Sequence, residues 1–132
     1  MSRQLSTQRG PSTVPATYRL VTVNPKPERA AHVASLVATR LQDRFTIQHI
    51  GNIESEDKVA TTVVELKPDI LFCASLWTSD ESTRIINTAI AALPGLLTHA
   101  VPYGLHNTGG PDAVVTHLAD SIGSLINNKD KI

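Results

Sequence analysis

The chain has 132 residues, the size of one globular domain, and 41% of them are hydrophobic while 18% are charged. Its 12 Lys and Arg residues balance its 12 Asp and Glu residues, so the sequence lacks the basic bias of proteins that bind nucleic acid or a membrane surface. No apolar run approaches the roughly 18 residues that would span a bilayer. The single cysteine, Cys73, excludes an internal disulfide and predicts a reducing, cytoplasmic location.

Residues 1–16 are predicted to form a disordered tail, and residues 17–132 a single domain. The first segment is rich in Ser, Thr, Gln, Arg and Pro and has no hydrophobic period. It also carries Arg3 and Arg9 without any acidic residue, which is typical of a transit peptide. A plain flexible tail and a targeting segment are therefore both open interpretations.

The first half of the domain predicts strand, helix and strand. Residues 18–24 are β-branched and apolar, which predicts a strand that ends at Pro25 and Pro27. A helix is expected over residues 28–42, because apolar side chains recur there at three- and four-residue spacing. Residues 45–50 alternate between apolar and polar side chains, which favours an edge strand with one face in water.

Two further strand–helix pairs follow. Ser55 is a suitable N-cap for a second helix, which Pro68 ends. Residues 70–77 are apolar on both faces, as expected of a central parallel strand. Ser79 or Asp80 is expected to cap a third helix to about residue 93. A fourth strand over 96–101, a glycine-rich loop over 103–110 and a last helix from Pro111 complete the pattern.

The regular alternation of strands and helices predicts a parallel sheet covered on both faces. With right-handed crossovers, we expect a small doubly wound α/β fold of the flavodoxin-like, Rossmann-like type. Its four parallel strands should run in the order 2-1-3-4, with two helices on each side. Homodimerisation is expected to cover an exposed edge strand.

The fold predicts where a ligand would bind. Parallel sheets bind ligands beyond the carboxyl ends of their strands, so the loops after the first, third and fourth strands form the candidate site. Its residues are Asn24, Ser75, Thr78, Tyr103, Gly104, His106, Asn107, Gly109 and Gly110. Glycines there allow a ligand to approach the backbone, although Gly109 and Gly110 are also ordinary residues for the start of a helix. Ser75 and Thr78 can equally cap the third helix.

His106 is the candidate catalytic residue, because it is the one group of this set that transfers protons near neutral pH. The other histidines, His32, His49, His99 and His117, fall within regular elements and are interpreted as structural. No His, Cys and Asp cluster has metal-ligand spacing, and no Walker or dinucleotide-binding glycine motif occurs. We therefore predict no metal and no cofactor, and expect a small ligand that is partly apolar or anionic.

Residues 45–78 resemble the cobalamin-binding domain family, which has a flavodoxin-like Rossmann fold. The resemblance rests on a glycine after one strand, an acidic residue and a valine in a capped helix, a Lys-Pro-Asp corner, and a serine and threonine after the next strand. These are Gly51, Glu56, Val59, Lys67, Pro68, Asp69, Ser75 and Thr78. Later glycines of the family match Gly109 and Gly110 more loosely.

The chain departs from that family after its first strand. The family has Asp-x-His-x-x-Gly there, and its histidine ligates cobalt. Residues 24–29 read Asn-Pro-Lys-Pro-Glu-Arg instead. The resemblance thus implies a stand-alone small-molecule-binding domain that does not ligate cobalamin.

Residues 23–28 and 77–82 are similar to parts of the antibiotic-biosynthesis monooxygenase family. That family is ferredoxin-like and forms dimeric α/β barrels, and some members act on polyketide-type substrates without a cofactor. This resemblance implies an alternative α+β fold and an enzyme. A protein-interaction module is a third interpretation, so the sequence leaves catalysis undecided.

Overall fold

The computed structural model describes residues 16–130, with side chains described as far as Ile126. The predicted disordered tail lies outside the described residues, apart from Ala16, which begins the first strand. The elements in chain order are β1 (Ala16–Val23), α1 (Pro27–Leu41), β2 (Phe45–Ile53), the 3₁₀ turn η1 (Glu56–Lys58), α2 (Val59–Leu66), β3 (Ile70–Cys73), α3 (Ser79–Ala92), β4 (Leu97–Ala100) and α4 (Leu105–Asp130).

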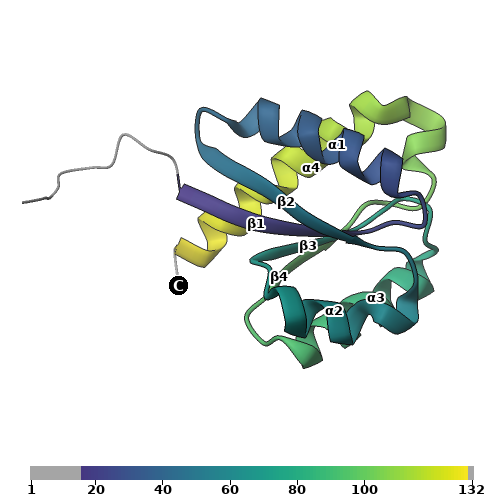
Figure 1. The fold of residues 1–132 in the computed structure, drawn as a ribbon. Coiled ribbons are helices and arrows are strands. Elements are labelled where there is room, and N and C mark those ends of the chain that lie inside the picture. Colours follow the sequence, from purple (N-terminus) through teal and green to yellow (C-terminus); the bar gives the residue numbers. More distant parts are fainter. Residues whose placement is uncertain (1–15, 131–132) are drawn as a thin grey trace, which may run out of the picture.

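The four strands form one parallel sheet in the order β2-β1-β3-β4 (Figure 1). Leu20 of β1 lies opposite Ile70 of β3, and Val23 lies opposite Cys73. This confirms the predicted fold and strand order. The ferredoxin-like alternative is wrong, because it requires antiparallel pairs, whereas β2 and β3 lie on opposite sides of β1 and both run parallel to it.

Two helices cover each face of the sheet, with α1 and α4 on one side and α2 and α3 on the other (Figure 1). Successive side chains of a strand point to opposite faces. Ile70 and Phe72 accordingly join the core under α1 and α4, while Leu71 and Cys73 join the core under α2 and α3. This is why β3 is apolar at every position.

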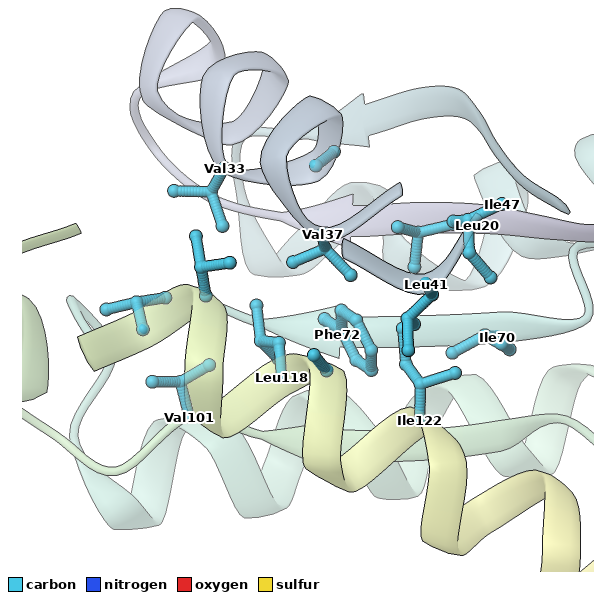
Figure 2. Packing of buried hydrophobic residues seen from close by; sticks show 14 of the residues in the cluster. Leu20, Val33, Val37, Leu41, Ile47, Ile70, Phe72, Val101, Leu118 and Ile122 are labelled. Atoms are coloured by element: carbon cyan, nitrogen blue, oxygen red, sulfur yellow. The ribbon is translucent and has the colours of Figure 1, made fainter. Parts of the chain in front are cut away.

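Figure 2 shows the core between the sheet and the helices α1 and α4. Val37, Leu118 and Phe72 fill its centre. Val33 and Val101 lie at its end toward the carboxyl ends of the strands. Both side chains are buried, and both border the candidate site described below.

Thr78 caps α3, which confirms the capping role that was one of its two predicted roles, whereas Ser79 and Asp80 lie within the helix. Its Oγ1 accepts a hydrogen bond from the Glu81 N–H (3.2 Å), and its own N–H donates to Glu81 Oε1 (2.9 Å). This reciprocal arrangement is a capping box. The strand before it ends at Cys73 rather than residue 77, because residues 74–77 form a turn in which the Trp77 N–H donates to the Ala74 carbonyl oxygen (3.4 Å).

Ser55 stands at the predicted position but makes no side-chain cap, and it precedes η1 rather than an α-helix. Its side chain instead bonds to the carboxylate of exposed Asp57, and this bond lowers the pKa of Asp57. The α-helical segment begins at Val59, directly after η1.

The predicted loop over 103–110 is helical from Leu105, so that prediction is wrong. Gly104 adopts a positive φ of 81°, and its carbonyl accepts the N–H groups of Asn107 and Thr108 (3.0 and 3.1 Å), which starts a helical turn. Gly110, with φ 74° and ψ −176°, then interrupts α4. Pro111 begins its second segment, as predicted.

None of the helices in residues 16–130 combines the length and the apolar composition needed to cross a membrane.

Candidate functional site

A small pocket lies beyond the carboxyl ends of β1 and β3, on the face that α1 and α4 cover. Its open space is about 40 Å³, and a water molecule needs roughly 10–15 Å³ on this measure. The pocket therefore admits a small end group of a ligand rather than a whole cofactor. Its lining residues are Thr22, Asn24, Arg29, Ala30, Val33, Phe72, Cys73, Ala74, Ser75, Leu76, Val101, His106, Val114 and Leu118.

Asn24 shapes the β1 side of the pocket. It is 5% exposed, and its Oδ1 accepts the backbone N–H of Lys26 (2.8 Å). Its carbonyl oxygen accepts Nδ2–H of Asn52 (3.0 Å). These bonds hold the turn from β1 into α1, so they set the position of the first turn of α1.

Ser75 joins the loop after β3 to the start of α4. Its carbonyl oxygen accepts the N–H of Gly104 (2.9 Å), and its Oγ lies 3.4 Å from the N–H of His106. Ser75 is buried. Through these contacts, two loops that are distant in sequence meet at one pocket.

Thr22 forms part of the wall on the β2 side. Its hydroxyl donates to Asn52 Oδ1 (2.7 Å) and lies 2.9 Å from His49 Nε2. Because the hydroxyl hydrogen goes to Asn52, we assign the His49 contact as N–H donation to Thr22. This network links the first two strands with satisfied polar groups, which agrees with the structural role predicted for His49.

Arg29 is the third residue of α1 and lines the pocket. Among the described side chains, its Nη1 is the one buried nitrogen or oxygen without a hydrogen-bond partner. A buried donor left unpaired costs about 1–3 kcal/mol. The first turn of a helix also carries the positive end of the helix dipole, which disfavours a cation there. The unpaired donor and the helix dipole each make Arg29 unfavourable for the folded state, unless an anion binds beside it.

His106 borders the same pocket from the first turn of α4. Desolvation lowers the pKa of its imidazole, and the nearby charge of Arg29 lowers it further. The ring is therefore neutral at neutral pH. In that state it can donate one hydrogen bond and accept one proton.

The structure brings together three of the nine predicted site residues: Asn24, Ser75 and His106. The other six do not line this pocket. Tyr103 is exposed and borders a separate hollow with Trp77 and Ile86 on the α3 side. Thr78 caps α3 through its hydroxyl, and Asn107 is exposed on α4.

The predicted glycines have conformational roles. Gly104 and Gly110 adopt positive φ, and a Cβ on Gly109 would lie 2.5 Å from the Cβ of Ala113. These positions shape the start of α4 and hold no part of the pocket wall.

Sequence reasoning missed Arg29. One signal was available, since a basic residue in the first turn of a helix opposes the usual preference for acidic residues there. The apolar walls of the pocket include Val33 and Leu118, which also belong to the core under α1 and α4.

Comparison with protein-family models, curated proteins and solved structures finds no match to this chain.

Proposed function

We propose that this domain binds a small molecule through a carboxylate group held by Arg29 and His106. The observation that carries this proposal is the buried, unpaired Nη1 of Arg29 in the wall of the pocket. Position supports it as well, because ligands of open parallel sheets bind beyond the strands' carboxyl ends at the switch point, which lies here between β1 and β3.

The chemistry of the pocket fits a carboxylate. A guanidinium presents a planar set of donors that matches the two oxygens of a carboxylate. The positive end of the α1 dipole adds to the attraction. The apolar walls contributed by Val33, Phe72 and Val101 exclude water, and a lower local dielectric strengthens the ion pair.

The size of the pocket limits the bound group. A space of about 40 Å³ accepts a carboxylate more readily than a phosphate with its four oxygens. The remainder of the ligand would extend outward past the start of α4. This agrees with the binding-domain interpretation that the cobalamin-family resemblance implied, and it requires no cobalt.

An enzyme that uses His106 as a general base is a second candidate. The lowered pKa of His106 favours a neutral ring, which is the form that accepts a proton. In such an enzyme Arg29 would hold the carboxylate, while His106 would accept a proton from a neighbouring carbon or oxygen of the same ligand.

Native mass spectrometry of the freshly purified protein tests for a retained acid. Calorimetric titration with acetate, the smallest suitable probe after formate, then tests the site directly. Arg29→Met should weaken acetate binding roughly tenfold or more, since a hydrogen bond to a charged group contributes about 1.5–3 kcal/mol. Arg29→Lys should retain part of it.

Lys26→Met is the matched control, because it removes an exposed cation just before the same helix. It should change the acetate affinity far less than Arg29→Met. Equal losses for both variants would show that only the general charge of this region matters. Tighter binding of inorganic phosphate than of acetate would contradict the carboxylate assignment.

A further inference from the structure

His99 and His117 form a pair on the side of the domain where β4 lies under α4. Their Nε2 atoms are 2.7 Å apart and their ring centroids 4.9 Å apart. Neither residue borders the pocket at Arg29. His99 belongs to the edge strand and His117 to the second segment of α4, so the fold brings together two residues that are 18 positions apart.

The hydrogen bonds of Ser121 indicate how the pair is protonated. The Ser121 hydroxyl donates to the His117 carbonyl oxygen (2.8 Å), and its Oγ lies 3.2 Å from His99 Nε2. Because the hydroxyl hydrogen is already used, Oγ accepts from His99, which therefore carries its hydrogen on Nε2. His117 Nε2 then offers a lone pair. The one hydrogen on His99 Nε2 is thus shared between Ser121 Oγ and His117 Nε2.

This pair faces a solvent-open hollow of about 340 Å³, which is also bordered by Asp120, Ser121, Ser124 and Leu125. Asp120 is exposed and follows His117 by three residues, so both side chains lie on one face of α4. In residues 16–130, no group of three or more His, Cys, Asp or Glu side chains is already arranged to hold a metal ion. Two imidazoles are in place, and a carboxylate stands on the rim of the same hollow.

We propose that His99 and His117 bind a zinc-type transition-metal ion, with Asp120 or water completing its coordination. The ion takes the place of the shared hydrogen, and that hydrogen moves from Nε2 to Nδ1 of His99. The number of hydrogens on the two rings does not change in this step, so no net proton is released. Two nitrogens on a tetrahedral zinc at about 2.0–2.1 Å lie about 3.3 Å apart, so the pair must open by a fraction of an ångström.

Imidazole nitrogen suits zinc, nickel and copper, whereas magnesium and calcium prefer oxygen ligands. The one thiol in the chain, Cys73, is fully buried and cannot compete for the ion. His117 is only half-buried, which leaves its ring room to adjust.

Titration of the isotopically labelled full chain with Zn²⁺, slightly above neutral pH, tests the proposal. The histidine-ring NMR signals of His99 and His117 should shift together and saturate at one equivalent, while those of His32 should not. Mg²⁺ should leave all of them unchanged. His117→Gln should weaken Zn²⁺ binding at least tenfold, whereas His32→Gln, on the exposed side of α1, should not.

Unshifted His99 and His117 signals, or unchanged Zn²⁺ affinity in His117→Gln, would overturn the proposal. The ring signals of the unaltered chain test the proposal even if the variant folds poorly. Arg29→Met should bind Zn²⁺ normally, so the zinc proposal and the carboxylate proposal can be tested independently.

Discussion

Trp77 Nε1 donates a hydrogen bond of 2.8 Å to the carbonyl oxygen of Val23, at the last residue of β1. The same carbonyl accepts the backbone N–H of Ala74 (3.0 Å). These two bonds hold the loop after β3 against the end of β1. They thereby fix Ser75, which lies between Ala74 and Trp77 and lines the pocket.

Trp77→Phe should therefore loosen the pocket as well as the loop. The change removes one donor, while Val23 O keeps its bond from Ala74, so we expect a loss of about 1 kcal/mol in the free energy of unfolding. Acetate binding should weaken at the same time. Urea denaturation and calorimetry measure the two effects, with the exposed Tyr103→Phe as the control. A variant that binds acetate as well as the unaltered chain would show that this loop does not set the site.

Cys73 should be unreactive in the folded protein. Its side chain is fully buried, and burial raises the pKa of its thiol to about 12. The thiolate is the nucleophile that attacks thiol reagents, and it is scarce at neutral pH when the pKa is raised in this way. Ellman's reagent should label Cys73 only when denaturant unfolds the chain. Rapid and complete labelling without denaturant would contradict the burial of β3.

His49 should make the fold sensitive to acid. Desolvation lowers the pKa of its imidazole in the folded state, so the unfolded chain binds a proton more readily. Stability is then complete above the unfolded pKa of about 6.5 and falls as the pH drops below it toward the lower folded pKa. His49→Gln should reduce this dependence, and His32→Gln should not. Urea denaturation at about pH 7.5 and about pH 5.5 measures it; equal slopes in all three proteins would contradict the prediction.

His106→Ala should weaken ligand binding with little effect on folding. The His106 ring stands at the pocket wall and is only partly buried, so its loss should change the free energy of unfolding by no more than about 0.5 kcal/mol. Acetate affinity and urea denaturation of the same sample separate the two effects. If His106→Ala unfolds the chain, and the protein that remains folded binds acetate normally, His106 is a structural residue.

The fold was predictable because each element carries its own periodic signal. β3 is apolar at all four positions, which marks a central strand, and the Val33–Val37 spacing marks the buried face of α1. The alternation of strands and helices then indicates a parallel sheet, and the strand order follows from the flavodoxin-like doubly wound type. The start of α4 was not predictable, because Gly104, Gly109 and Gly110 are typical of a loop as well as of a tightly packed helix start.

The site was only partly predictable. Asn24, Ser75 and His106 follow the ends of three strands, so topology alone places them near one another. The burial of the Arg29 Nη1 atom depends on tertiary packing, so the basic residue in the first turn of α1 was the one local signal. The His99–His117 pair likewise requires β4 to lie beneath α4, because each histidine by itself is an ordinary residue of its own element.

The free energy of unfolding of the unaltered chain and of Arg29→Met, each measured with and without acetate at equal ionic strength, tests the central claim most directly. A ligand that binds only the folded state stabilises it in proportion to the logarithm of its concentration over Kd. We predict that Arg29→Met is at least as stable as the unaltered chain without acetate, because the unpaired guanidinium is gone. Acetate should then stabilise only the unaltered chain. If Arg29→Met is less stable without acetate, and acetate stabilises both proteins equally, Arg29 is a structural residue and the carboxylate site is wrong.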